Sequence, residues 1–324
     1  MKKILQQITL IILTFTINSL SQWSTDPNNN LIVGYGQDPR ICSDGTGGCY
    51  ITYDYHNLYY PRWLALERLD KYGYKPWGIN KRILGESPEQ SGAKIIEDGE
   101  GGVIVSYSDS YQNLPYWTQR IRVQKVDSSG NFLWGPTGVR VTTTEINQGS
   151  QAIVSDGSGG CVVVWQNYDE RILMNRIDRN GQRVWSDSGI VIASTGTSLI
   201  LLRASDGNYY VQIRRNLYRI REDGEIIRRD SVTLGYPVAD SDGGLILSGK
   251  TGTINNIKLI SQRKDSLGNN LWQEPYVEIA DSLDINTHLE IKYNNGFIYY
   301  SWSGKKNGID KGVCKIICVN DKIH

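Results

Sequence analysis

The feature that most constrains this chain is a two-part sequence repeat with a period of about fifty residues. The first phrase, DGxGG, is complete at residues 44–48, 98–102 and 156–160 and degenerate at 206–207, 240–244 and 294–296. The second phrase, DxxGxxxW, follows at residues 70–77, 127–134, 178–185 and 265–272, and a copy at 221–224 has lost its Asp and its Trp. Such a repeat indicates a solenoid or propeller, whose units bury their faces against their neighbours.

The second repeat shows what one unit contains. Residues 92–97 and 103–107 read as strands on either side of the first phrase, and residues 120–126 alternate charged and apolar side chains. Residues 108–118 read as a polar and aromatic loop, and residues 132–141 complete the unit. Four short antiparallel strands per repeat, with no helical periodicity, are typical of a propeller blade.

We therefore predict an all-β fold, a six-bladed β-propeller of four-stranded antiparallel blades in one domain spanning residues 22–324. The six expected inner hairpins turn at Gly48, Gly102, Gly160, Gly207, Gly244 and Gly296. The two ends of the chain are out of phase with the repeat. Residues 319–321 stand where a third strand would finish, and Trp23 stands where a fourth strand would start. We expect residues 23–33 to be the outermost strand of the last blade, which would close the ring and remove two exposed sheet edges.

The repeated residues have structural explanations. An Asp at the start of a turn accepts hydrogen bonds from amides two residues further on, and Gly supplies a positive φ. The Trp of the second phrase lies on the outer strand, where it can cover the seam to the next blade. The residues with these predicted structural roles are Asp44, Gly48, Asp98, Gly102, Asp156, Gly160, Trp77, Trp134, Trp185 and Trp272.

The N-terminus reads as a secretory signal. Lys2 and Lys3 precede an apolar run at residues 8–15 and small residues at 19–21, so we expect cleavage after Ser21. The protein is then extracellular, on the cell surface or periplasmic, and we expect a monomer without a membrane span. Removing residues 1–21 takes two of the 35 basic residues and none of the 34 acidic ones. That near-balance of charge argues against nucleic acid as a partner.

The five cysteines are too few for a disulfide-dense scaffold. If residues 44–47 form the hairpin loop, Cys42 faces Cys49, so this pair is the disulfide candidate. Cys161 occupies the position of Cys49 in its own repeat without such a partner, which favours a buried free thiol. Cys314 and Cys318 lie too far apart along one strand to bridge each other.

The complete unit resembles known repeats. Its GxxxW element is similar to the tryptophan-docking motif of quinoprotein-like propellers. The whole pattern, clearest at residues 155–192, more closely resembles tandem repeats of secreted bacterial surface proteins of unknown function, which are often linked to type IX secretion. The resemblance implies a propeller fold and an exported protein, and it implies no particular ligand.

Catalytic and metal-binding motifs find little support. Residues 244–251 match the P-loop expression, but the helix that this motif requires falls on residues that read as strands. The three histidines are scattered, so no metal site is predicted, and neither is a cofactor. No catalytic residue can be assigned.

The loops between the second and third strands remain as candidates for function. They lie on the face opposite both repeated phrases, and in the first three repeats they are rich in aromatic residues. Exposed Tyr and Trp on a rigid scaffold are favoured at binding surfaces, although they could instead shield the blade tops. The candidate ligand-binding residues are Tyr59, Tyr60, Arg62, Trp63, Tyr111, Tyr116, Trp117, Tyr168, Asp169 and Arg171.

These loops predict an exported binding or scaffold module that recognises a glycan or a protein partner. The alternative is a carbohydrate-active enzyme, a glycoside hydrolase or lyase with acids at the mouth of the central channel. Such an enzyme needs two converging carboxyl groups with perturbed pKa values, whereas a binding module needs only an exposed aromatic patch. We expect binding rather than catalysis.

Overall fold

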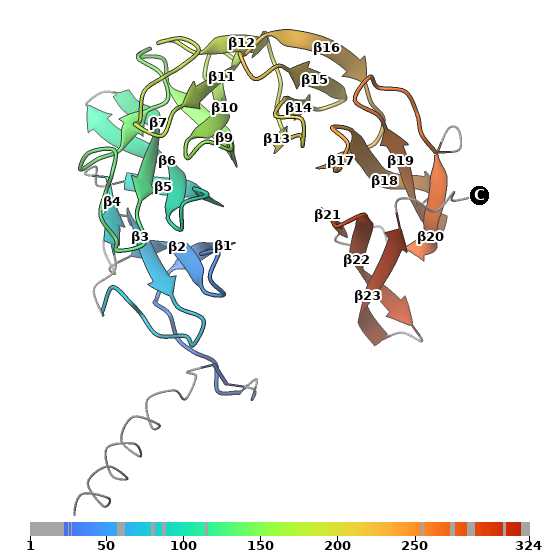
Figure 1. Ribbon diagram of the computed structural model, residues 1–324, viewed down its shortest axis with the longest axis horizontal. Coiled ribbons are helices and arrows are strands. Elements are labelled where there is room, and N and C mark those ends of the chain that lie inside the picture. The colour runs from blue at the N-terminus through green and yellow to red at the C-terminus, as the bar shows by residue number, and fades with distance from the viewer. Residues whose placement is uncertain are drawn as a thin grey trace, which may run out of the picture.

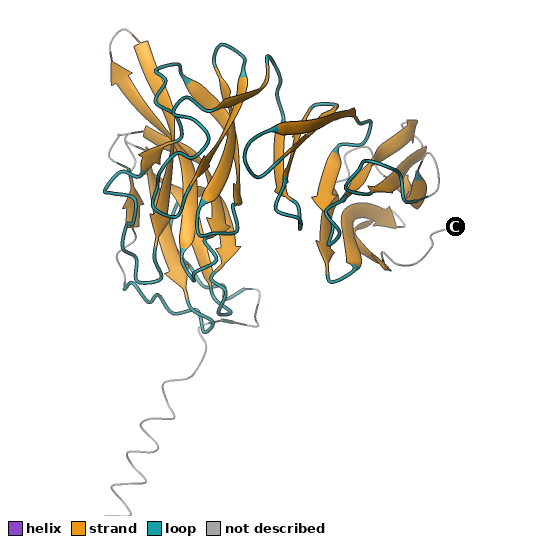
Figure 2. Ribbon diagram, turned by 45° about the horizontal axis from the view of Figure 1, so that its top comes forward, coloured by secondary structure: helices purple, strands orange, loops and turns teal. Residues whose placement is uncertain are grey.

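The computed structural model describes residues 23–24, 26, 28–56, 62–78, 82–85, 89–113, 116–253, 256–272, 276–283, 289–306 and 309–318. Within these ranges every regular element is a β-strand (Figure 2), as the repeat predicts. No helix that could cross a membrane occurs in this part of the chain.

The strands form five sheets. The first holds eight strands: β1 (Gln37–Ser43), β2 (Cys49–His56), β3 (Arg62–Leu69), β4 (Arg82–Leu84), β5 (Glu89–Glu97), β6 (Val103–Asn113), β7 (Tyr116–Val126) and β8 (Val139–Arg140). Within it, β3 and β5 are joined by one parallel pair, Arg62 with Glu89. The second sheet holds β9 (Gln148–Ser155), β10 (Cys161–Asn167), β11 (Ile172–Ile177) and β12 (Ile190–Ala193).

Two further sheets have four antiparallel strands each and the last has three. The third sheet holds β13 (Leu199–Arg203), β14 (Tyr209–Ile213), β15 (Asn216–Ile220) and β16 (Ile226–Ser231). The fourth holds β17 (Tyr236–Ala239), β18 (Leu245–Thr253), β19 (Asn256–Lys264) and β20 (Val277–Leu283). The fifth holds β21 (Leu289–Asn294), β22 (Phe297–Lys306) and β23 (Ile309–Cys318).

The sheets follow one another along an open arc (Figure 1). The first strands of successive repeats contact one another in the order β1, β5, β9, β13, β17 and β21, and they lie toward the inner side of the arc. Apolar side chains fill the space between neighbouring sheets: Ile104 and Val123 of the first sheet pack in one cluster with Val163 and Trp165 of the second. The arrangement is thus propeller-like, with each unit buried against the next.

The six predicted hairpins all form. The pairs β1–β2, β5–β6, β9–β10, β13–β14, β17–β18 and β21–β22 are antiparallel and turn at the first phrase of each repeat. At the second repeat, Asp98 Oδ1 accepts hydrogen bonds from the amides of Glu100 and Gly102, each at 2.8 Å. Gly99 and Gly101 have φ values of 77° and 87°, which confirms the turn roles read from the sequence.

The prediction of six closed four-stranded blades is wrong. The described residues between Trp23 and Val33 form no strand, and the last sheet has three strands. The N-terminal segment lies against the first sheet instead, because Trp23 Nε1 donates to the carbonyl of Lys71 at 3.0 Å and Lys75 Nζ donates to the carbonyl of Val33 at 2.5 Å. Figure 1 shows β1 and β23 at opposite ends of the open arc.

The predicted Cys42–Cys49 disulfide is also wrong. The first turn is one residue longer than assumed, with the amide of Asp44 donating to the carbonyl of Gly48. Ser43 consequently faces Cys49 while Cys42 faces Tyr50, and both cysteines are free thiols. Cys161 is a buried free thiol, as predicted.

The P-loop match is structural, as expected. Residues 245–251 belong to β18 and pair with β19 in continuous antiparallel register. The helix that would follow a phosphate-binding loop is therefore replaced by a strand.

Candidate functional site

The predicted aromatic loop of the second repeat is mostly a long hairpin. Strands β6 and β7 stay paired from Val103 with Val126 to Asn113 with Tyr116, so residues that we expected in a loop continue the sheet. The far end of this hairpin, at Asn113 and Tyr116, is the end opposite the repeated turns. The hairpin gives the candidate residues a rigid support in place of a flexible connection.

The structure describes only part of the predicted set. Tyr59 and Tyr60 lie outside the described residues, and only the backbone of Tyr116 and Trp117, in β7, lies within them. Arg62 and Trp63 begin β3 and are half-buried, with Trp63 opposite Tyr55. Tyr111 is half-buried in β6, whereas the side chain of Tyr168 is 65% exposed.

Tyr168 is the exposed aromatic residue of this face that is held from two sides. It lies in the turn between β10 and β11, where its amide donates to the carbonyl of Asn147 at 2.8 Å. Its phenolic oxygen donates to Gln119 Oε1, on β7, at 2.6 Å. The ring is thereby fixed at both ends while its surface remains open to solvent.

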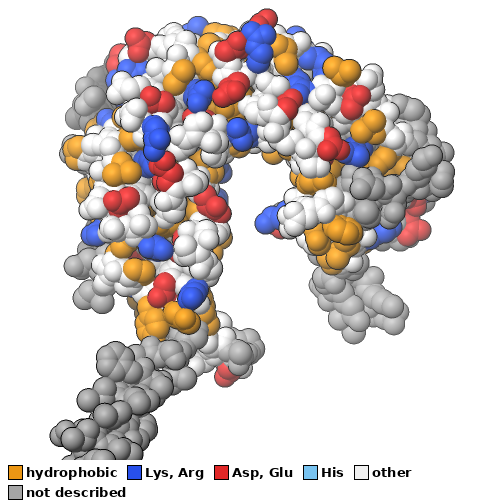
Figure 3. Space-filling model, viewed as in Figure 1, with side chains coloured by type: hydrophobic (Ala, Val, Ile, Leu, Met, Phe, Trp, Pro, Cys, Tyr) orange, Lys and Arg blue, Asp and Glu red, His pale blue; other side chains and the backbone are white. Residues whose placement is uncertain are grey.

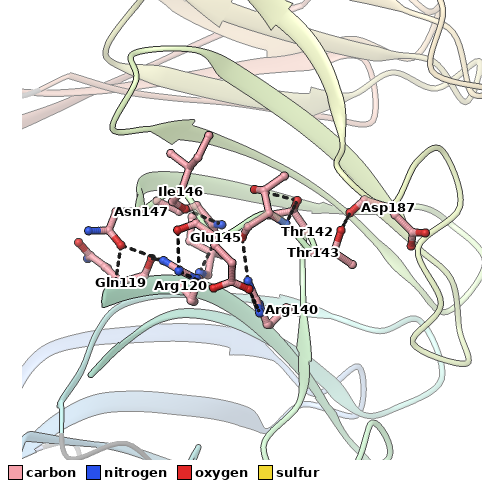
Figure 4. Close-up of polar contacts among 12 residues, drawn as sticks. Gln119, Arg120, Arg140, Thr142, Thr143, Glu145, Ile146, Asn147 and Asp187 are labelled. Atoms are coloured by element: carbon pink, nitrogen blue, oxygen red, sulfur yellow. Dashed lines mark hydrogen bonds and ion pairs between the residues drawn. The ribbon is translucent and has the colours of Figure 1, made fainter. Parts of the chain in front are cut away.

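Arg120 lies at the centre of a polar cluster that includes Gln119 and Asn147 (Figure 4). Its guanidinium donates to Asn147 Oδ1 at 2.8 Å, and to the carbonyl and Oε2 of Glu145, both at 2.7 Å. Arg140 Nη1 binds Glu145 Oε1 at 2.9 Å. The hydrogen bonds from Arg120 and then Arg140 lower the pKa of Glu145. The connection from β8 to β9 is therefore fastened to β7 through charged and amide groups.

Asn147 links the two halves of the site. Its side-chain oxygen accepts from the amide of Gln119 at 3.1 Å as well as from Arg120, while its carbonyl holds Tyr168. None of these linking residues was among the predicted ones. The sequence could have indicated them only by position: Gln119 and Arg120 directly follow the aromatic segment of the second repeat, and Asn147 directly precedes the third repeat.

A second polar group lies further along the same hairpin. Asp109 is fully buried, and its Oδ2 accepts from Arg122 Nε at 2.7 Å and from the Tyr111 hydroxyl at 2.5 Å. Burial, then the hydrogen bond to Asp109, raises the pKa of Tyr111, which keeps that hydroxyl protonated as a donor. Because Tyr111 is half-buried, it is a weaker candidate for ligand contact than the exposed Tyr168.

Asp169 and Arg171 pair with each other across the β10–β11 turn. Arg171 Nη2 lies 2.6 Å from Asp169 Oδ2, and this contact lowers the pKa of Asp169. An exposed pair of this kind contributes little to stability. Both side chains stay beside Tyr168 and are accessible to a ligand.

Two hollows lined by described residues lie on the face of the repeated turns. One, of about 590 Å³, is lined by Arg176, Val184, Trp185, Arg221, Glu222 and Asp223. Hydrogen bonding from Arg221 lowers the pKa of Asp223. Each described carboxyl group whose pKa departs from its ordinary value has it lowered, as at Asp44, Glu100, Asp127, Glu145 and Asp265.

The described residues hold no cluster of three or more His, Cys, Asp or Glu side chains that could bind a metal ion. Figure 3 shows basic and acidic side chains interspersed over the face in view, in keeping with the formal charge of +1 for the whole sequence.

No protein-family model and no curated protein matches this chain. Solved structures with distant similarity include a protein of unknown function from Dyadobacter fermentans, at 8% identity and a TM-score of 0.49, covering 86% of this chain and 93% of the other. An ulvan lyase of polysaccharide lyase family 25 is 12% identical, with a TM-score of 0.47 and coverages of 87% and 78%. A putative exo-β-1,3-galactanase from Bifidobacterium bifidum is 10% identical, with a TM-score of 0.41 and coverages of 89% and 93%.

Proposed function

We propose that this protein is an exported binding module that recognises a glycan on the face formed by the β6–β7 hairpin and the β10–β11 turn. The observation that carries the proposal is the exposed ring of Tyr168, fixed by Gln119 and Asn147. Export rests on the signal sequence read at residues 1–21, which lie outside the described residues.

A glycan suits this site because sugars offer an apolar ring face and a rim of hydroxyl groups. A fixed tyrosine ring presents a large contact area at a small cost in conformational entropy. Gln119 binds the Tyr168 hydroxyl, and Asp169 and Arg171 follow Tyr168 in the β10–β11 turn, so amide, carboxylate and guanidinium groups that can bond sugar hydroxyls belong to the same site. The pre-organisation of Tyr168 reduces the ordering cost that binding would otherwise incur.

Binding is favoured over glycoside hydrolysis by the charge state of the carboxyl groups near Tyr168. A general acid of a glycosidase needs a raised pKa so that it holds a proton at neutral pH. The carboxyl groups near Tyr168 with shifted pKa values are Asp169 and Glu145. Hydrogen bonds from arginine side chains lower the pKa of both. Both groups are suited to accept hydrogen bonds as carboxylates.

A glycan array followed by calorimetry on the strongest ligand tests the proposal. Tyr168→Ala should weaken binding at least tenfold, about 1.4 kcal/mol, and change the free energy of unfolding by less than about 1 kcal/mol because the residue is exposed. Tyr168→Phe keeps the ring and loses the hydroxyl, so it should lose less affinity.

The matched control is Tyr72→Ala, which removes another exposed tyrosine, on the face of the repeated turns. It should leave the affinity unchanged. Equal losses from Tyr72→Ala and Tyr168→Ala, or no glycan ligand for a folded protein, would overturn the assignment of this face.

A further inference from the structure

Successive repeats are joined by one recurring contact. The Trp that ends the second phrase of one repeat is its docking side chain. It donates a hydrogen bond to a backbone carbonyl of the next repeat, that of the residue in the second position of the second phrase. The contacts are Trp77 to Ser128 at 2.9 Å, Trp134 to Arg179 at 3.1 Å and Trp185 to Glu222 at 3.2 Å. In the degenerate copy Arg228 replaces the Trp and donates to Ser266 at 2.8 Å.

Trp23 makes the same contact on the first repeat. Its indole donates to the carbonyl of Lys71 at 3.0 Å, and Lys71 follows Asp70, the first residue of that second phrase. Trp23 thus stands where the docking residue of a preceding repeat would stand, although no preceding repeat exists in the described chain. By this contact the N-terminal segment takes the place of the outer strand of a sheet that would precede the first one. Among the described residues no sheet lies at that position.

The residues after Trp23 keep the spacing of an outer strand. β1 begins at the same interval after Trp23 as β9 after Trp134 and β13 after Trp185. In those repeats the intervening residues hold the fourth strands β8 and β12. The same interval after Trp23 gives residues 28–31, and the apolar run Leu31 to Val33 that begins there is not part of any strand. Ile32 is 65% exposed.

The fifth sheet has the complementary deficiency. Its strand order is β21, β22, β23, so one edge of β23 has no strand partner within the described chain, at the position that a fourth strand fills elsewhere. Cys314, Lys315 and Ile316 on β23 are exposed. A free edge presents a row of unpaired amides and carbonyls, and an extended segment can join it through main-chain hydrogen bonds.

We infer that residues 28–34 of one copy of the chain pair with the free edge of β23 in a second copy. Within one chain the two elements lie at opposite ends of the arc (Figure 1), and Trp23 and Lys75 fasten the segment to the first sheet. Joining the arcs head to tail places the fifth sheet of one copy beside the first sheet of the next. The contact is heterologous, so it builds a closed ring or an open chain of copies, in place of the expected monomer.

Complementation between two variants of the full chain tests this inference. Leu31→Pro with Ile32→Pro removes adjacent amides from the donor segment, which forms no strand of its own, so the fold is spared. Ile316→Pro blocks the acceptor edge. Each variant alone should sediment as a monomer, while the wild type should grow in mass with concentration, and an equimolar mixture of the two variants should form a 1:1 complex.

The matched control is Leu31→Thr with Ile32→Thr, which keeps the amides and the strand propensity and should retain assembly. Circular dichroism establishes that each variant is folded, and if Ile316→Pro is not, the donor variants alone decide the result. A wild-type chain that stays monomeric at every concentration would overturn the inference. Assembly of the double-proline variant as strong as that of the wild type would also overturn it. A protein that is monomeric and whose melting temperature falls on introducing the two prolines would indicate pairing within one chain instead.

Discussion

The indole of Trp134 donates a hydrogen bond to the carbonyl oxygen of Arg179, 3.1 Å away in the second turn of the following repeat. The Trp134 side chain is 5% exposed, and a side chain added to Gly181 would meet its ring at 3.0 Å. One residue therefore seals the seam between the first and second sheets, and the glycine of the next turn gives the ring its space.

Replacing Trp134 with Ala should destabilise the protein by about 3 to 5 kcal/mol, because a buried aromatic side chain leaves a cavity in the seam. Trp185→Ala should cost less, since Trp185 is half-buried. Denaturant unfolding measures both. Neither change should lower ligand affinity selectively; loss of binding by a folded Trp134→Ala variant would mean that the repeated-turn face is the functional one.

Lys125 should be essential for the second repeat. Its side chain is 2% exposed, and Nζ lies 2.7 Å from Glu100 Oε2 and 3.4 Å from Asp98 Oδ2. Lys125→Met should cost about 3 to 5 kcal/mol, because it leaves the buried Asp98 carboxylate without its cation. Adding Asp98→Asn keeps the turn-capping oxygen and removes the charge, so the double variant should be more stable than Lys125→Met alone. The free energy of unfolding in denaturant decides this order.

Asp44 should make stability depend on pH in acid. Burial alone would raise its pKa, but hydrogen bonds from Arg68, Thr46 and Gly48 lower it from 3.8 to about 2. Because the folded-state pKa lies below the unfolded one, its contribution is present above pH 3.8 and is lost as the pH falls toward about 2. The stability difference between the wild type and Asp44→Asn should therefore be constant above pH 3.8 and shrink below it. A difference independent of pH would show that the carboxylate charge is not the stabilising feature.

The thiols should differ in reactivity. Burial raises the pKa of Cys161 well above its ordinary value, and its side chain is fully buried, whereas Cys314 is exposed. A thiol reagent should label Cys314 quickly in the native protein and Cys161 only after unfolding. Mass spectrometry of labelled peptides measures both rates, and rapid native labelling of Cys161 would contradict its place in the core.

Short-range contacts made much of this structure predictable. The capping by Asp98 spans four residues, and such turns are specified by the residues that form them. The six hairpins and the seam position of the tryptophans follow from those turns. The basic partners, such as Arg176 for Asp156 at 2.9 Å, escaped prediction, although a basic residue two positions before the second phrase marks most of them in the sequence.

The candidate site was predictable in its face and not in its construction. Tyr168 was identified by its aromatic loop, but Gln119 and Asn147, which hold it, come from another sheet and from a connection. Their bonds join residues distant in sequence, and no local pattern encodes such pairs. The expected loop at residues 108–118 became a hairpin because cross-strand pairing continues nearly to its end.

The sequence by itself determined the all-β repeat, its turns and its seams, because each depends on bonds within a turn or on an interval repeated along the chain. The tertiary structure alone decided that the cysteines near the first turn do not face each other, since one extra residue shifts the register. It also decided that the arc stays open, with Trp23 and Val33 in contact with its first sheet. Closure requires pairing between opposite ends of the chain, which has an entropic cost of loop closure that no local sequence pattern reveals.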